Sequence, residues 1–291
     1  FEGNNTDSVF FEQKKYYDKF SKMYNRRKNY LINSIPKPES YDNNNNSLIS
    51  FSMSWSETRG RRPDQQDSIA IIKNIQDKNI HYLGLYDGHG GTISSEITGD
   101  ILHTLFIERL SKLEKLSKEK IIPLFSESFW ELNDYLKAKN INDGTAVNVI
   151  FLTPNLIYCA NAGDSRSILV KDGGIAYPLS IDHKPEDDDE RKRIEEAGGF
   201  VTESKRVNGV LALSRAIGDA DLQPPITCEP NVTVTEITPE DKYLVMGCDG
   251  LWDVLDSDQV AQAIKDIPTA SEAVTFLRDA AYTLGSTDNI S

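Results

Sequence analysis

The feature that most constrains this chain is an Asp-Gly pair that twice follows an apolar, strand-like run. The first lies in Tyr86-Asp87-Gly88-His89-Gly90-Gly91 and the second in Met246-Gly247-Cys248-Asp249-Gly250. A carboxylate at a strand end has little backbone freedom, and glycine lets a ligand approach the main chain closely. One such motif alone fits a simple tight turn. Its repetition favours a binding site in which two carboxylates are held in fixed positions.

Two further carboxylates stand beside Gly, Asn or Ser at element boundaries, Asp164 in Asn161–Arg166 and Asp288 in Thr287-Asp288-Asn289. Hard oxygen ligands of this kind suit Mg²⁺ or Mn²⁺, whereas zinc prefers His and Cys. The chain has only four histidines, in no paired spacing, and three cysteines without a CxxC motif. His89 abuts Asp87, where an imidazole can serve as a general acid.

Composition narrows the class of protein further. The formal net charge of −13 disfavours nucleic-acid binding, and no apolar run is long enough for a membrane span. Three widely spaced cysteines indicate a reducing compartment, the cytoplasm or the nucleus. We expect a monomer, because no heptad seam is evident. The chain begins at Phe1 without a leader sequence, so we read it as a fragment.

The chain divides into residues 1–47, a charged and aromatic extension with an Asn-rich linker, and a domain over 48–291. The extension is read as a short helix and flexible linker, either a solvated segment or a docking arm. Alternating or apolar runs predict strands, and apolar residues at helical spacing predict helices. The predicted strands are Ser50–Ser56, Ser68–Lys73, Ile80–Tyr86, Ala146–Leu152, Ile157–Ala160, Ser167–Val170, Val232–Ile237 and Tyr243–Cys248. The predicted helices are Ile93–Leu110, Pro123–Lys139, Pro185–Ala197, Val260–Ile267 and Ala273–Leu284. This order implies an α+β layering.

A set of motifs in this order and spacing resembles the metal-dependent serine/threonine protein phosphatases of type 2C. The motifs are Arg62…Gln66-Asp67, Tyr86–Gly91, Asp143–Ala146, Ala160–Arg166, Asn208–Asp219, Cys248–Asp253 and Asp288-Asn289. The resemblance runs from about Ser50 to the last residue. It implies a central β-sandwich of two antiparallel sheets flanked by pairs of α-helices, a four-layer αββα fold. Family members continue into another strand beyond the position of Ser291, so we expect the domain to lack its last strand.

The resemblance also implies a ligand set for Mg²⁺ or Mn²⁺. The matching positions are Asp67, Asp87, Gly88 through its carbonyl, Asp164, Asp249, Asp253 and Asp288. In the family the residue matching Asp87 bridges two ions, and those matching Asp164 and Asp253 bind a weaker third. A metal-bridging hydroxide then attacks phosphoserine or phosphothreonine of a protein substrate directly.

Two more catalytic roles follow from the same resemblance. Arg62 matches the arginine that binds the substrate phosphate, and His89 matches the residue that protonates the leaving oxygen. The charged segment Asp182–Arg206, called the flap segment below, matches a family region beside the cleft. It fits either substrate selection or a plain exposed helix with loops.

Two alternatives stay open beside the protein phosphatase. One is a non-catalytic relative that binds partners, which the presence of Asp87, Asp249 and Asp288 disfavours. The other is a metal-dependent hydrolase of small phosphoesters, whose chemistry would be the same and whose cleft surroundings would differ.

Gln66 departs from the family pattern, since many members carry Glu at this position. A neutral amide contributes one negative charge fewer to the second metal, although its carbonyl oxygen can still accept. We therefore expect Gln66→Glu to tighten binding of the second divalent cation while both proteins remain active. Calorimetric titration with Mn²⁺ checks this, and an unchanged affinity would contradict it.

Overall fold

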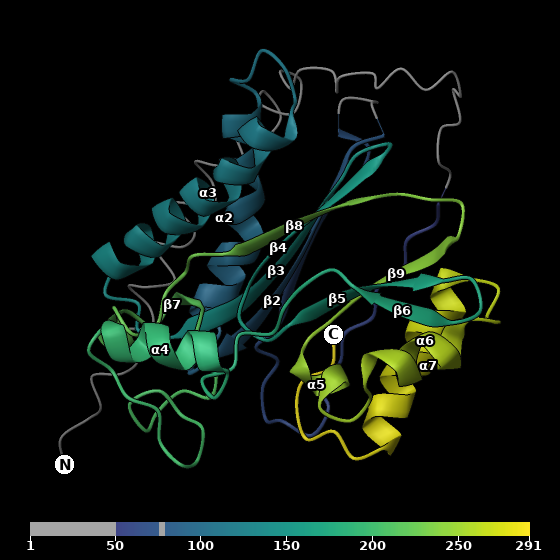
Figure 1. Ribbon diagram of the computed structural model, residues 1–291. Coiled ribbons are helices and arrows are strands. Elements are labelled where there is room, and N and C mark those ends of the chain that lie inside the picture. Colours follow the sequence, from purple (N-terminus) through teal and green to yellow (C-terminus); the bar gives the residue numbers. More distant parts are fainter. Residues whose placement is uncertain (1–50, 76–78) are drawn as a thin grey trace, which may run out of the picture.

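The computed structural model describes residues 51–75 and 79–291, which form four stacked layers. Two antiparallel sheets lie in the middle, and helices cover the outer face of each (Figure 1). The four-layer arrangement expected from the sequence is therefore confirmed. The predicted helix and linker of the extension, residues 1–47, lie outside the described residues.

The larger sheet has the strand order β1-β2-β3-β4-β8, with short β7 paired to β3. Every pairing in it is antiparallel. Its strands are β1 (Ser68–Ile72), β2 (His81–His89), β3 (Gly144–Leu152), β4 (Leu156–Ala162), β7 (Ile217–Gly218) and β8 (Asn231–Glu236). The smaller sheet has the order β6-β5-β9, formed by β5 (Arg166–Lys171), β6 (Ile175–Pro178) and β9 (Asp241–Gly247). Strands β6 and β7 were not predicted.

Alternation along the strands explains why two sheets stack. In β3, Val147, Val149 and Phe151 face the core beneath the helices, whereas Ile150 and Leu152 face the other sheet. Successive side chains of a strand point to opposite faces, so a strand with apolar residues on both faces must be covered on both. All nine residues of β3 are buried, as its central place requires.

The outer layers are two helical groups (Figure 1). Helices α2 (Ile93–Leu110) and α3 (Lys118–Ala138) cover the larger sheet. Helices α5 (Asp249–Trp252), α6 (Ser257–Ile264) and α7 (Ala270–Thr283) lie with the smaller one. The last two begin three residues before their predicted starts. Asp256 forms a capping box with Gln259, and Thr269 accepts a hydrogen bond from the backbone of Glu272.

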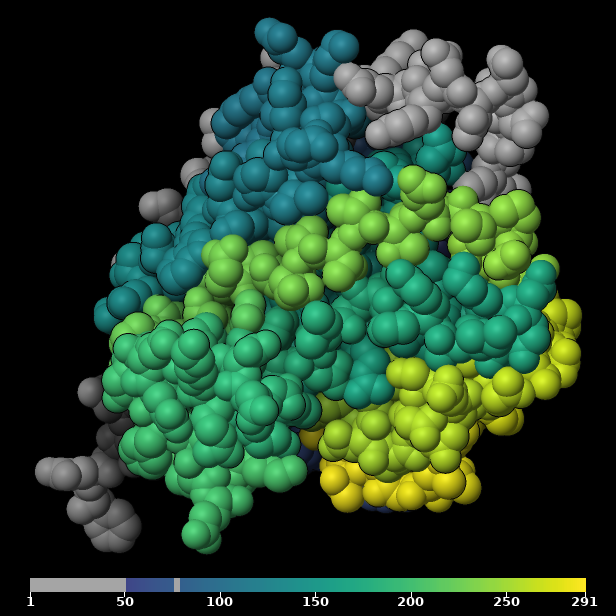
Figure 2. Space-filling model, viewed as in Figure 1, coloured from purple at the N-terminus to yellow at the C-terminus, as the bar shows by residue number. Residues whose placement is uncertain are grey.

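The flap segment contains α4 (Asp188–Glu196) and is anchored by a buried carboxylate. Glu190 accepts hydrogen bonds from Arg193, Ser214 and Arg215. Burial alone would raise the pKa of Glu190, but these donors outweigh it and lower the pKa to about 2. Figure 2 shows this green segment and the yellow C-terminal helices as two lobes on either side of a hollow. The short 3₁₀ helix η2 (Ala220–Leu222) follows β7.

The predicted strand Ser50–Ser56 is wrong for its described part, Phe51–Ser56. None of these residues belongs to a sheet. The nearest β-bridge is at Thr58, which pairs with Ile290 outside the named strands. Phe51, Met53 and Trp55 instead line a cavity of about 520 Å³ between the sheets. Ser52, Ser54 and Ser56 line the same cavity, and Phe51 and Trp55 are exposed. The period of two therefore does not mark one buried face, and the paired backbone that defines a strand is absent from Phe51–Ser56.

Candidate metal centre

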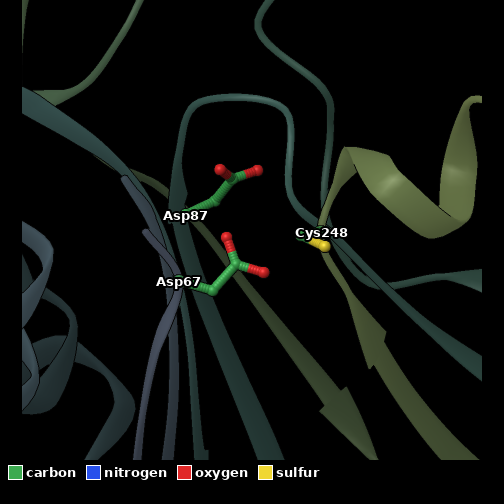
Figure 3. Close-up of side chains that lie close together, drawn as sticks. All are labelled: Asp67, Asp87 and Cys248. Carbon is green, nitrogen blue, oxygen red and sulfur yellow. The ribbon is translucent and has the colours of Figure 1, made fainter. Parts of the chain in front are cut away.

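Asp67 and Asp87 come from neighbouring strands of the larger sheet. Asp67 directly precedes β1, and Asp87 lies within β2, which pairs with β1 so that Ser68 is opposite Tyr86. Figure 3 shows the two carboxylates close together, with the thiol of Cys248 approaching from the end of β9. The ligand atoms of these three residues lie within 4.8 Å of one another.

Asp87 also belongs to a second group of carboxylates. Its oxygen lies within 4.8 Å of those of Asp164, in the turn between β4 and β5, and Asp249, the first residue of α5. The two Asp-Gly motifs are therefore brought together by the two different sheets. Asp87 is common to both groups, which is the position a bridging ligand requires.

Glycine allows the chain around Asp288 to approach this centre. A Cβ on Gly250 would lie 1.8 Å from the carbonyl oxygen of Asn289, so any other residue would push that segment away. Likewise, a Cβ on Gly88 would lie 2.4 Å from the carbonyl oxygen of Gln66. The backbone packing thus depends on the glycine of each Asp-Gly pair.

Burial and mutual repulsion raise the pKa values of the clustered carboxyl groups. Burial, and then the charge of Asp249, raises the pKa of Asp87 well above its usual value. Burial and the charges of Asp164 and Asp288 raise the pKa of Asp249 to about 8, and burial raises that of Asp67 to about 6. A bound divalent cation would offset this repulsion and desolvation, so these oxygens fit Mg²⁺ or Mn²⁺.

Cys248 adds a thiol to this centre that the sequence alone did not associate with it. Burial and the nearby charges of Asp67 and Asp87 raise the pKa of the thiol well above its usual value. The backbone N–H of Ser291 donates a hydrogen bond to Sγ over 3.2 Å. Cys248 is therefore a buried neutral thiol and a poor ligand for a hard cation. All three cysteines are free and buried.

Asp288 and Asp253 lie at the edge of the centre. Neither belongs to the two close groups, although the charge of each helps to raise the pKa of Asp249. Asp288 Oδ2 accepts a hydrogen bond from Arg62 over 2.6 Å, and the guanidinium is about half exposed. Two predicted site residues with different expected roles are thus paired with each other.

His89 is oriented by a carboxylate that sequence reasoning missed. Its Nε2 donates to Asp219 Oδ2 over 2.7 Å, and Asp219 adopts a left-handed conformation with φ of 50°. Burial lowers the pKa of His89, but the hydrogen bond from its imidazole to Asp219 and the surrounding carboxylates outweigh it, so the pKa is raised. Asp219 is the last residue of the Asn208–Asp219 motif, and this position was the only feature of the sequence that could have marked it as a site residue.

Comparison with known proteins identifies the family. Residues 51–290 match the protein family described as Protein phosphatase 2C. The chain is 38% identical over 247 residues to "Probable protein phosphatase 2C 7" of Oryza sativa subsp. japonica, covering 82% of this chain and 64% of that protein. It is 33% identical over 248 residues to "Protein phosphatase 2C homolog 1" of Saccharomyces cerevisiae, covering 79% and 86%. The chain belongs to the protein phosphatase 2C family.

Solved structures agree with this assignment. "Structure of a C.elegans sex determining protein" superposes with a TM-score of 0.71 at 28% identity, covering 81% of this chain and 62% of that one. "Crystal structure of serine-threonine phosphatase 2C from Toxoplasma gondii" has a TM-score of 0.69 at 20% identity, covering 88% and 96%, and it supports the fold alone. The chain spans 64% of the rice relative and 65% of the Arabidopsis thaliana relative "Probable protein phosphatase 2C 11".

The raised pKa of Asp249 predicts an unusual pH dependence of stability without metal. A carboxyl whose pKa rises from 3.8 to about 8 on folding takes up a proton, so stability falls as the pH rises through that window. Asp249→Asn removes this titration, so it should stabilise the metal-free protein more at pH 8 than at pH 5, by about 3 kcal/mol. Thermal unfolding in EDTA measures both values.

Asp172→Asn is the matched control, because Asp172 is 60% exposed and pairs with Lys242 outside the centre. It should leave the pH dependence unchanged. Equal destabilisation by Asp249→Asn at both pH values would contradict the electrostatic account.

Proposed function

We propose that this chain is a metal-dependent protein serine/threonine phosphatase that hydrolyses phosphoserine and phosphothreonine directly. The observation that carries the proposal is the convergence of Asp87 with Asp67 on one side and with Asp164 and Asp249 on the other. Membership of the protein phosphatase 2C family supports the reaction class. No covalent phosphoenzyme is needed, and Cys248 is a buried thiol with a raised pKa, unsuited to act as a nucleophile.

Asp67, Asp87, Asp249 and Asp288, with the carbonyl of Gly88, are the proposed ligands of two Mg²⁺ or Mn²⁺ ions. Asp164 and Asp253 are the proposed ligands of a weaker third ion. When bound, such ions lower the pKa of a coordinated water and offset the charge of a phosphoryl group. The raised pKa values of Asp67, Asp87 and Asp249 support the assignment, because these groups need a positive partner to ionise together.

Arg62 is the proposed phosphate-binding residue. Its guanidinium stands at the edge of the carboxylate cluster and is 49% exposed, so it can meet a substrate arriving from solvent. The planar fork can donate to two phosphate oxygens at once, which orients the phosphorus towards the centre. Asp288 accepts from Nη2 alone, so the phosphate would either share the guanidinium with this carboxylate or displace it.

His89 is the proposed general acid, protonating the serine or threonine oxygen as it leaves. The carboxylate of Asp219 holds the Nε2 side of the imidazole and favours its protonated form. An alkoxide is a poor leaving group, so a proton delivered here lowers the barrier for phosphoserine far more than for an acidic phenol ester. Asp219 is thus a positioning residue for His89.

The proposed division of the chain is an extension over residues 1–47 and a catalytic domain over 48–291. Phosphorylated proteins are the proposed substrates and a monomer the proposed state. Free, buried cysteines support a reducing compartment, the cytoplasm or the nucleus. In the described residues, no helix has the length and apolar character that crossing a bilayer demands.

The proposal predicts hydrolysis of a phosphothreonine peptide with Mn²⁺ or Mg²⁺ and none in excess EDTA. Asp87→Asn should abolish turnover and leave the circular dichroism spectrum unchanged, because one shared ligand is lost from both groups. Phosphate release measures the rate. Turnover of an aryl phosphate without the peptide would favour a small-phosphoester hydrolase, and no turnover of either would favour a binding protein.

The role of His89 predicts a dependence on the leaving group. His89→Gln should slow phosphothreonine-peptide hydrolysis roughly 100-fold, the scale of general acid catalysis, and spare an aryl phosphate with an acidic phenol. Asp219→Asn, which suits the left-handed backbone, should show the same selectivity to a smaller degree. Single-turnover rates on both substrates provide the test, and equal losses on both would contradict an acid role.

A further inference from the structure

Lys184 forms an ion pair within the candidate metal centre. Its ammonium group donates to Asp164 Oδ2, the carboxylate that also groups with Asp87 and Asp249. The Asp164 side chain is only 6% exposed and the Lys184 side chain 32%. From the sequence, the flap segment that contains Lys184 fits either substrate selection or an exposed helix with loops. The structure turns Lys184 inward instead.

The backbone before Lys184 is anchored to the same turn that carries Asp164. His183 N donates to the carbonyl oxygen of Gly163 over 3.0 Å, and Gly163 N donates to His183 Nδ1 over 3.2 Å. Arg166, just after the turn, donates to both oxygens of Asp182 over 3.0 and 2.6 Å. These hydrogen bonds between the flap segment and the β4–β5 turn therefore hold Lys184 next to Asp164.

The ammonium of Lys184 acts on more than one carboxylate of the centre. Its electrostatic partners include Asp249 and Asp253 besides Asp164. A lysine ammonium is a compact point charge, so it offsets the same repulsion that a divalent cation would offset. It cannot share Asp164 Oδ2 with a cation without like-charge repulsion at close range.

We propose that Lys184 is an internal counter-ion that competes with a divalent cation for Asp164. When a cation binds Asp164, the Lys184 ammonium is released from this carboxylate, and the flap segment loses that contact with the centre. The inference rests on the proposed function, because it takes Asp164 as a ligand of the weaker ion. Lys184 then lowers the affinity of Asp164 for the weaker ion. It also couples binding of that ion to the contacts made by the start of the flap segment. It is a positioning residue and need not touch the substrate.

Calorimetric titration with Mg²⁺ tests the competition. Lys184→Met removes the charge and keeps an unbranched side chain, so the weakest binding step should tighten roughly tenfold. The tighter steps should change little. Lys205→Met is the matched control, because Lys205 lies in the same segment and pairs with Glu186 at 3.0 Å, outside the carboxylate group. It should bind Mg²⁺ as the unmodified chain does, and so should Lys184→Arg, which keeps the charge.

Lysine acylation followed by mass spectrometry tests the release. The Lys184 amine should become several-fold more reactive when Mg²⁺ is raised through the weakest binding step. The amine of Lys192, 76% exposed, serves as the reference within the same sample. Neither measurement depends on turnover.

The outcomes separate this inference from the function on which it rests. If the unmodified chain binds Mg²⁺ and Lys184→Met binds it with unchanged affinity, the competition is wrong and the proposed function stands. Unchanged reactivity of Lys184 through the titration would overturn the release. A chain that binds no divalent cation at all would overturn both the inference and the proposed metal-dependent chemistry.

Discussion

Mutual repulsion among buried carboxylates is the constraint on which the rest of this structure depends. Asp87 lies close to Asp67, Asp164 and Asp249, and its pKa rises because burial and neighbouring charges oppose ionisation. A chain gains nothing in stability from such an arrangement, so the two sheets must hold it against its own electrostatics. The stacked β-sandwich does so by bringing strand ends from both sheets to one edge. The cost in stability supports a functional reason for the arrangement.

Basic side chains relieve part of that repulsion. Arg62 donates to Asp288, and Lys184 pairs with Asp164, at positions where cations are proposed to bind. A third pair differs in kind, since Glu190 is fully satisfied by Arg193, Arg215 and Ser214 and simply anchors α4. The first two pairs involve proposed site residues, and the contacts of Glu190 position the flap segment. The two kinds of contact differ in how many hydrogen-bond donors each carboxylate receives from neighbouring side chains.

Local signals in the sequence were reliable where neighbouring residues decide the structure. The helix Ile93–Leu110 has the predicted bounds, because its apolar spacing is complete. The predicted strand Ser50–Ser56 failed for Phe51–Ser56, because pairing with another strand is a tertiary fact that alternation alone does not supply. The short strand β7 was missed for the converse reason: its two residues are a strand only because β3 lies beside them.

The sequence by itself determined the family resemblance, the layering of strands and helices, and the choice of hard oxygen ligands, since these depend on residue type, order and local period. The resemblance implied that Asp87 bridges two ions, but only the tertiary structure shows its oxygen within 4.8 Å of both ligand groups. Tertiary structure also decided that Cys248 is a buried thiol beside them. It also decided that Lys184 faces Asp164. Such contacts join residues far apart along the chain, and their distances follow from how two sheets pack, which no local pattern records.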